Sequence, residues 1–277
     1  MNNIFSHSLQ GKRDANEDQH LHIINMDNNN KLLNNINFFA VFDGHGGKTV
    51  SKYLKDNLPK FFINKFNNNI YTDHDKTSKY FVKVFDLIQD KLKEDHPRAV
   101  QHCGSTCCIV IQYMDAESKN RLWVLNVGDS RAVKCNNGDI AEQLSQDHKP
   151  NNPVEKKRIE QLGGTIEFDG CDWRIKDLSL SRAFGDIDCK PYVTHLPQIY
   201  HYKVSSRDKF LILACDGLWD ILSNQDAVDF INSLLINNKK CNYAKELAEH
   251  ALNKGSLDNI TVIVYFFNQE LLKGSTF

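Results

Sequence analysis

The sequence lacks any apolar run long enough to cross a membrane, and its first residues, MNNIFSHSLQGKRD, contain no apolar core of signal-peptide length. It also lacks an excess of either charge, because 34 basic and 35 acidic residues give a formal net charge of −1. A balanced charge provides no bulk attraction to nucleic acid or to an anionic membrane. We therefore expect no membrane span and no nucleic-acid partner.

The cysteines lack the spacing of a zinc site. Eight are scattered along the chain, and no two of them form a C-x-x-C pair. None is followed six positions later by arginine, which excludes the cysteine-dependent phosphatases. This usage is typical of reduced cysteines, so we expect an intracellular protein, in the cytoplasm, the nucleus or both.

The hydrophobic pattern predicts a mixed fold. With 277 residues, 41% of them hydrophobic, the chain is long enough for one large domain, alone or with an inserted lobe. Apolar or alternating runs predict strands at 20–25, 36–43, 105–114, 121–129, 209–217 and 259–267. Helical spacing predicts helices at about 48–66, broken near Pro59, at about 77–94, within 151–164, and two more after 217. Because strands and paired helices mix without βαβ regularity, the predicted class is α+β.

Several predicted strands carry an acidic residue at one end. These acids are Glu17 and Asp18, Asp43, Asp129, Asp216 and Asp258. Carboxylates from different strands of one sheet system can converge on a single edge, where they would repel one another. Divalent cations relieve such repulsion, and an all-oxygen ligand set selects Mg²⁺ or Mn²⁺ over Zn²⁺. The sequence therefore predicts a magnesium or manganese site.

The run FFAVFDGHGG places a histidine beside one of these acids. Taken alone, D-G-H-G-G is typical of a turn, so its interpretation depends on the other acids. Two cations can hold a hydroxide between them for attack on a phosphoryl group, as in many phosphatases. His45 then suits the role of proton donor to the leaving oxygen, and Arg13 offers a planar fork to the phosphate oxygens.

Eight runs occur in an order that identifies a family. They are QGKRDANED, FFAVFDGHGG, GSTCCIVI, LNVGDSRAV, LSQDHKPNNPVEKKRIEQLGG, LSLSRAFGD, ILACDGLWDIL and DNITVIV. On these motifs the chain resembles the metal-dependent, type 2C protein serine/threonine phosphatases (PPM family) over nearly its whole length. The resemblance implies a four-layer αββα sandwich, in which two central, mostly antiparallel sheets are flanked by helix pairs. It further implies a single phosphatase domain over residues 1–277, with a flap lobe inserted at about 146–192.

The resemblance also implies a set of metal ligands. Asp43 would bridge two Mn²⁺ or Mg²⁺ ions, and the backbone carbonyl of Gly44 would complete one coordination shell. Asp216 and Asp258 would bind one ion. Glu17 would bind the other, directly or through water.

Further residues are implied in supporting or catalytic roles. Asp18 would support the metal centre, and Asp129, with Asp216 and Asp220, would help to hold a weaker third ion, as in some members of the family. Arg13 would bind phosphate, and His45 would be the general acid. The implied activity is one-step removal of phosphate from phosphoserine and phosphothreonine in phosphoprotein substrates, with no covalent enzyme intermediate; we expect a monomer.

Within the lobe, four polar residues are expected to hold it in place rather than to take part in chemistry: Asp147, His148, Arg182 and Asp186. Two positions depart from the family pattern. Asp177 stands where glycine is usual, which puts an aspartate at a turn position that favours positive φ. Leu257 stands beside Asp258, where a polar or basic residue is frequent.

Three other interpretations remain to be weighed. DHDKT at 73–77 matches the D-x-D-x-T of haloacid-dehalogenase-type phosphatases, but no buried strand precedes it, so we interpret it as a helix N-terminus. The D-x-H of DGHGG also occurs in calcineurin-like phosphoesterases, whose Gly-Asn-His-Glu element is absent here. A pseudophosphatase, which keeps the fold only to bind a partner, is the alternative from a different class. It predicts a lost ligand, whereas every implied ligand is present.

Overall fold

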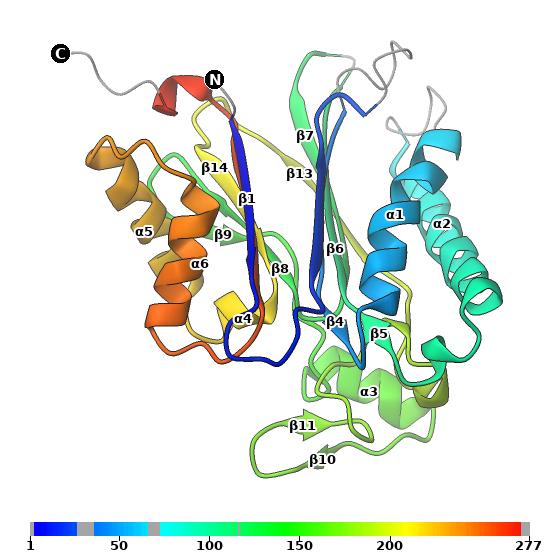
Figure 1. Ribbon diagram of the computed structural model, residues 1–277. Coiled ribbons are helices and arrows are strands. Elements are labelled where there is room, and N and C mark those ends of the chain that lie inside the picture. Colours follow the sequence, from blue (N-terminus) through cyan, green and yellow to red (C-terminus); the bar gives the residue numbers. More distant parts are fainter. Residues whose placement is uncertain (1–2, 27–35, 66–72, 116, 273–277) are drawn as a thin grey trace.

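The computed structural model describes residues 3–26, 36–65, 73–115 and 117–272, and its core consists of two five-stranded antiparallel sheets. In order across the first sheet, the strands are β1 (Ile4–Leu9), β15 (Ile260–Phe266), β14 (Phe210–Ala214), β8 (Arg131–Cys135) and β9 (Ala141–Gln143). In order across the second sheet, they are β13 (Gln198–Lys203), β7 (Asn120–Val127), β6 (Cys107–Met114), β3 (Asn37–Phe42) and β2 (Gln19–Ile23). The predicted strands are thus divided between two sheets that face each other (Figure 1).

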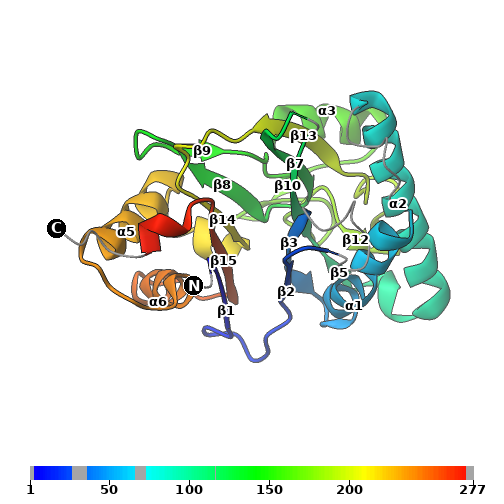
Figure 2. The same cartoon turned by 90° about the horizontal axis from the view of Figure 1, so that it is seen from above.

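Helices cover the outer face of each sheet (Figures 1 and 2). The second sheet is covered by α1 (Thr49–Lys65) and α2 (His74–Asp95). The first sheet is covered by α5 (Asn224–Ile236) and α6 (Tyr243–Asn253), with the short α4 (Asp216–Trp219) after β14. This arrangement confirms the predicted four-layer αββα sandwich. In the described part of the chain, no helix combines the length and the apolarity needed to cross a membrane.

Strand β3 has a nearly continuous apolar sequence because both faces of the strand are covered. Phe38, Ala40 and Phe42 pack on the helix side of the sheet, in one hydrophobic cluster with α1 and α2. Phe39 and Val41 point to the opposite side and pack against the other sheet. Both faces of the strand are therefore buried, as its sequence predicts.

The prediction of a helix break near Pro59 is wrong. Helix α1 continues through Pro59 to Lys65. Proline removes one backbone hydrogen bond from a helix. Leu58 and Phe62, on either side of it, are fully buried against the second sheet, and this packing holds the helix together across the lost bond.

The DHDKT run does begin a helix. Asp73 is the N-cap of α2, and its side chain accepts a hydrogen bond from the backbone N–H of Lys76 at 3.1 Å. This confirms the interpretation of the run as a helix N-terminus.

Although Asn-Gly is typical of a two-residue hairpin turn, the loop between β8 and β9, which contains Asn137-Gly138, is longer. It runs from Asn136 to Ile140, and the residue with positive φ is Asp139. The side chain of Asn136 accepts hydrogen bonds from the backbone N–H groups of Gly138 and Ile140, which stabilises this wider loop.

Smaller elements gather at one end of the sandwich (Figure 1). A three-stranded sheet contains β12 (Phe184–Gly185), β5 (Gly104–Ser105) and β4 (Gly44–His45), in that order. Residues 146–192 add α3 (Pro153–Gln161) and a hairpin of β10 (Glu167–Phe168) and β11 (Trp173–Arg174). A separate small hydrophobic cluster lies in and beside this segment, and includes Ile159, Ile175, Leu180, Ala183, Cys189 and Val193. Short 3₁₀ turns complete the described chain at Ala99–Gln101, Ile187–Cys189 and Gln269–Leu272.

Candidate active site

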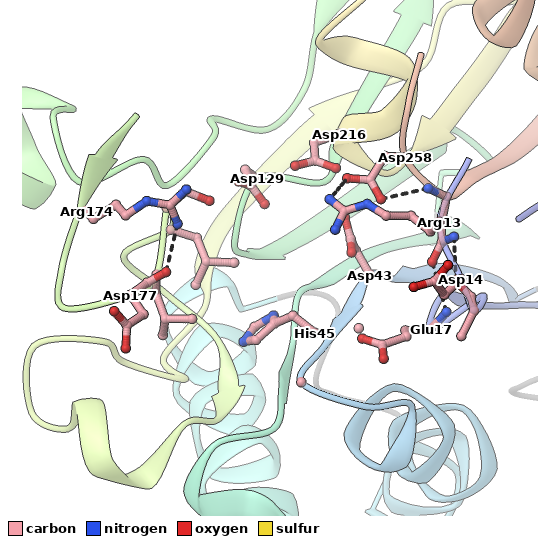
Figure 3. A pocket seen from close by; sticks show the side chains of 17 residues that line it. Arg13, Asp14, Glu17, Asp43, His45, Asp129, Arg174, Asp177, Asp216 and Asp258 are labelled. Carbon is pink, nitrogen blue, oxygen red and sulfur yellow. Dashed lines mark hydrogen bonds and ion pairs between the residues drawn. The ribbon is translucent and has the colours of Figure 1, made fainter. Parts of the chain in front are cut away.

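A cavity of about 420 Å³ is lined by residues of β4 and of the 146–192 segment, among others. These elements lie at one end of the sandwich (Figure 1). Among the residues that line the cavity are eight predicted from the sequence: Arg13, Glu17, Asp43, Gly44, His45, Asp129, Asp216 and Asp258. Figure 3 shows their side chains approaching one another from several elements. Asp18 and Asp220 are not among the lining residues.

The acids meet because the ends of strands from both sheets meet. Asp43 directly follows β3 of the second sheet, and His45 belongs to the short β4 that comes next. Asp216 begins α4, two residues after β14 of the first sheet ends at Ala214, and Asp258 lies just before β15. Residues far apart in sequence are therefore brought to one edge, as the acids at the strand ends predict.

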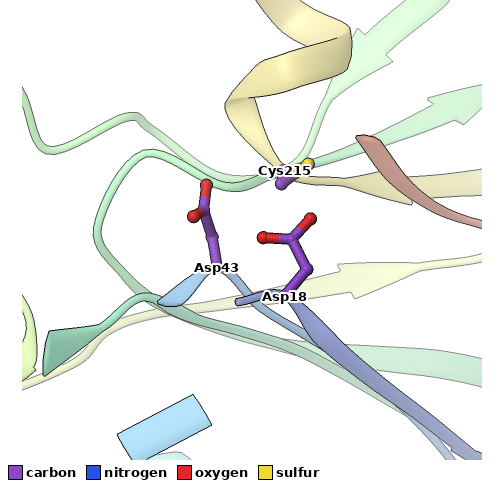
Figure 4. A group of neighbouring side chains, drawn as sticks. All are labelled: Asp18, Asp43 and Cys215. Carbon is purple, nitrogen blue, oxygen red and sulfur yellow. The ribbon is translucent and has the colours of Figure 1, made fainter. Parts of the chain in front are cut away.

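Asp18 does not line the cavity but lies close to Asp43 and Cys215 (Figure 4). One ligand atom from each of the three lies within 4.8 Å of the others. Asp18 is buried, and among the described residues neither of its carboxylate oxygens has a hydrogen-bond partner. An unpaired buried carboxylate is costly, and a nearby divalent cation would relieve that cost.

The carboxylates in this cluster repel one another. Burial, followed by the charges of Asp216, Asp18 and Asp129, raises the pKa of Asp43 well above its ordinary value. Burial and the charge of Asp129 raise the pKa of Asp216 to about 8. Without added positive charge these carboxyls cannot all ionise at neutral pH. Because the donors are carboxylate oxygens, the residues present fit Mg²⁺ or Mn²⁺.

Two side chains of the chain itself bring positive charge to the cluster. Arg13 Nη2 lies 2.6 Å from Asp258 Oδ2, and the Arg13 side chain is 62% exposed. Lys149 Nζ lies 2.5 Å from Asp129 Oδ2 and 3.9 Å from Asp216 Oδ2. Burial alone would lower the pKa of Lys149, but the charges of these two acids outweigh it and raise that pKa. Sequence reasoning missed Lys149, although it lies in the quoted DHKP run.

Asn259 is a second residue that sequence reasoning missed. Its side-chain Nδ2 donates to the backbone carbonyls of Gln10, at 2.7 Å, and Ala15, at 2.9 Å. Its Oδ1 accepts from the backbone N–H of Glu17 at 2.9 Å. Asn259 thus holds the loop that carries Arg13 and Glu17 against the start of β15.

His45 has a partner from the 146–192 segment. Its Nε2 lies 2.8 Å from Oδ2 of Asp186, which is 2% exposed. Burial lowers the pKa of His45, but the hydrogen bond and the charge of Asp186 outweigh it, so the net pKa is raised. Asp186 therefore does more than hold the lobe, because it contacts a predicted catalytic side chain.

The other three lobe residues contact structural partners. Asp147 accepts two hydrogen bonds from Arg131, at 2.9 and 2.6 Å. Both ring nitrogens of His148 are hydrogen-bonded. Arg182 pairs with Glu155 at 2.5 Å, and Glu155 is 2% exposed. Sequence reasoning did not identify Glu155, whose burial depends on α3 packing against the rest of the lobe.

The two departures from the family pattern leave the cavity intact. The positive φ in this turn belongs to Lys176, at 52°, and not to Asp177, so the expected backbone strain at Asp177 is absent. Asp177 lines the cavity, and its carbonyl accepts a hydrogen bond from Arg174 Nη1 at 2.7 Å. Leu257 is 70% exposed beside Asp258 and is not among the lining residues.

Known proteins resemble this chain in sequence and in fold. The profile of the family Protein phosphatase 2C matches residues 2–260. A PP2C-like domain-containing protein of Acanthamoeba polyphaga mimivirus is 41% identical over 180 residues, which are 57% of this chain and 100% of that protein. A probable protein phosphatase 2C of Arabidopsis thaliana is 38% identical over 261 residues, covering 94% of this chain and 65% of that protein. The solved structure of a serine-threonine phosphatase 2C from Toxoplasma gondii superposes with a TM-score of 0.81 at 24% identity, covering 96% of this chain and 94% of that one.

Proposed function

The chain belongs to the protein phosphatase 2C family and is a protein phosphatase, and from this premise we propose that it hydrolyses phosphoserine and phosphothreonine esters with two Mg²⁺ or Mn²⁺ ions as cofactors. The observation that carries the proposal is the convergence of the five predicted carboxylates with Arg13 and His45 in a single cavity. Such a set can hold divalent cations, bind a phosphate and donate a proton.

The proposed ligands come from the acids at the strand ends. Asp43, between the two sheets, would be shared by both ions, with the carbonyl of Gly44 beside it. Asp216 and Asp258, each next to a strand of the first sheet, would bind one ion, and Glu17 would bind the other. The raised pKa of Asp43 and of Asp216 supports this assignment, because bound cations would stabilise the ionised carboxylates.

Residues in and near the cavity would support the centre. Asp18, without a hydrogen-bond partner in the described structure, would place its negative charge close to Asp43. Asp129, with Asp220, would help to bind a weaker third ion. That ion would compete with Lys149, whose ammonium group is already paired with Asp129.

The chemistry is then divided between cofactor and protein. Bound divalent cations supply an activated water as the nucleophile and neutralise negative charge on the phosphoryl group. Arg13 would bind the non-bridging phosphate oxygens, which match the fork of its guanidinium group. Its present partner, Asp258, is a proposed ligand, so cation binding would weaken that ion pair and release Arg13 toward phosphate.

His45 would protonate the oxygen that leaves. As the bond between phosphorus and the serine or threonine oxygen breaks, that oxygen takes a proton from the imidazolium of His45. No side-chain nucleophile is required, and no cysteine lines the described cavity.

We also propose that residues 146–192 form a flap lobe of one phosphatase domain that spans residues 1–277. Support comes from Arg174 and Asp177, which line the cavity opposite Arg13 (Figure 3). The neighbouring Leu178, Ser179 and Leu180 line the cavity as well. A substrate entering the cavity would contact these lobe residues.

The test is the initial rate of phosphate release from a phosphothreonine peptide, with Mn²⁺ titrated into chelator-stripped protein. Saturable activation in the wild type, absent in Asp43→Asn, would support a metal-dependent phosphatase. No turnover by folded wild-type protein would overturn the proposal and favour a pseudophosphatase that binds phosphoproteins.

A further inference from the structure

The contact between His45 and Asp186 is built by the three-stranded sheet. His45 of β4 pairs with Gly104 of β5, and Gly104 in turn pairs with Gly185 of β12. Asp186 follows directly, in the left-handed region at φ 45° and ψ 49°. The backbone N–H of Asp186 donates to the carbonyl of Cys103 at 3.2 Å. The two side chains thus reach each other across the central strand, from positions 141 residues apart.

Gly104 leaves the space through which they meet. A Cβ atom at position 104 would lie 2.0 Å from Asp186 Oδ2 and 2.5 Å from His45 Nε2. Both distances are far below van der Waals contact, and both atoms belong to the hydrogen bond itself. Any side chain at position 104 would therefore displace Asp186, His45 or both.

In the described structure, the main polar contact of the Asp186 carboxylate is with His45. It is 2% exposed, and its one recorded side-chain hydrogen bond within the described ranges is the bond to His45. Burying a charged carboxylate costs several kcal/mol unless it is well paired. If this position served packing alone, an apolar side chain would be buried at a lower cost in free energy than a carboxylate.

We propose that Asp186 is the positioning residue of the general acid. It accepts the Nε2–H of His45, which fixes the ring orientation and directs Nδ1 toward the cavity as the proton-donating atom. None of the described residues hydrogen-bonds this Nδ1. This inference rests on the proposed function, because it assigns a role within the same reaction.

The proton transfer can be written in full. Before reaction, His45 is an imidazolium with hydrogens on both nitrogens, and Asp186 is ionised. When the bond between phosphorus and the leaving oxygen breaks, the leaving oxygen takes the Nδ1 proton. His45 is left as the neutral Nε2–H tautomer, and Asp186 still accepts the hydrogen bond from its Nε2–H. The attacking water forms the new bond to phosphorus, and one of its protons passes to solvent.

The kinetic test compares substrates that differ in their need for an acid. The variants are Asp186→Asn, Gly104→Ala, His45→Gln and the double variant of His45→Gln with Asp186→Asn. Asp188→Asn is the matched control, because Asp188 Oδ2 lies 2.8 Å from Nδ1 of His102, whose side chain is 81% exposed. Each protein is assayed with Mn²⁺ on a phosphothreonine peptide and on p-nitrophenyl phosphate, whose leaving group barely needs protonation.

We expect Asp186→Asn to lower the ratio of peptide rate to aryl rate at least tenfold, but no more than His45→Gln does, since Asp186 acts through His45. In the His45→Gln background, Asp186→Asn should lower that ratio no further. Gly104→Ala should resemble Asp186→Asn, and Asp188→Asn should keep the wild-type ratio. An unchanged ratio in Asp186→Asn, or independent losses in the double variant, would overturn the proposal.

A spectroscopic test does not depend on turnover. In ¹⁵N-histidine-labelled, Mg²⁺-saturated protein, the His45 signals are assigned by their loss in His45→Gln. At a pH where the ring is neutral, we expect the Nε2–H tautomer in the wild type and in Asp188→Asn, and a mixture in Asp186→Asn. The Nδ1–H tautomer in the wild type would overturn the positioning role. Absence of phosphatase activity with the Nε2–H tautomer present would instead count against the proposed function alone.

Discussion

Asp43→Asn should make the metal-free protein more stable, even though it removes the central acid of the proposed metal site. The carboxylate oxygens of Asp18 and Asp43 approach within 4.8 Å, and Asp18 has no hydrogen-bond partner in the described structure. At that separation two ionised carboxylates would repel by about 3 kcal/mol, if the effective dielectric constant is about 20, so the metal-free folded protein must either bear this repulsion or keep a proton on one of the two groups. Asparagine has nearly the same volume but no charge, so the substitution removes this repulsion from the folded state only.

The size of the effect depends on pH and has a definite sign. Burial raises the pKa of Asp18 to about 6, so the folded protein binds more protons than the unfolded chain between about pH 4 and 6. Stability of the metal-free wild type therefore falls as pH rises through this window. The advantage of Asp43→Asn should be small at pH 4 and grow to at most about 3 kcal/mol at pH 8. For a chain of this size that corresponds to a melting temperature higher by about 5 °C.

Added cation should reverse the order. A ligand that binds only the folded state at 100 times its dissociation constant stabilises it by about 2.7 kcal/mol. Wild type should gain this stability from Mn²⁺, and Asp43→Asn should gain little. The assay is thermal unfolding at pH 8, with chelator and with Mn²⁺, and the exposed Asp90→Asn serves as the control for a simple change of net charge. A lower melting temperature for Asp43→Asn in chelator, or full stabilisation by Mn²⁺, would refute the reasoning.

Three further predictions concern other side chains. Arg13→Ala should weaken inhibition by inorganic phosphate and raise KM for a phosphopeptide by about 10- to 100-fold, because one charged hydrogen-bonding group is lost; steady-state kinetics measures both. His45→Gln should slow hydrolysis of a phosphothreonine peptide by about 10²- to 10⁴-fold, and an equal loss on p-nitrophenyl phosphate would contradict the general-acid role. Glu155→Gln should lower the free energy of unfolding by about 3–5 kcal/mol, since it leaves Arg158 and Arg182 partly buried without their counter-charge; urea unfolding measures this. Burial raises the pKa of Glu155, but its arginine partners outweigh that and lower it to about 2, so its contribution should be intact above about pH 4.5 and decline as pH falls toward 2.

Much of the fold could be predicted because burial leaves a local pattern. The run NFFAVF of β3 and the run ITVIVYF of β15 are apolar on both faces, so each predicts a strand covered on both sides. The break expected at Pro59 failed because local propensity is a weak determinant when flanking residues are fully buried. Packing against the second sheet decided that case.

The acidic candidate ligands of the site could be predicted from the sequence, but the polar residues that contact them or hold nearby loops could not. Acids at strand ends are visible in the sequence, whereas Lys149, Asn259 and Glu155 look like ordinary surface residues there. Their functions depend on contacts with residues between 20 and 249 positions away, such as Asp129, Gln10 and Arg182. Only the packed structure determines which polar group each one meets.

By itself, the sequence determined the types of element, the faces that they bury and the chemical character of the site, because periodicity and residue type are properties of short segments. Tertiary structure alone decided which side chains face one another. The ends of two sheets bring Asp43 and Asp216 to one cavity, and a three-stranded sheet joins His45 to Asp186 through the space left at Gly104. Such contacts depend on the register between distant strands, which is fixed by the packing of the whole molecule.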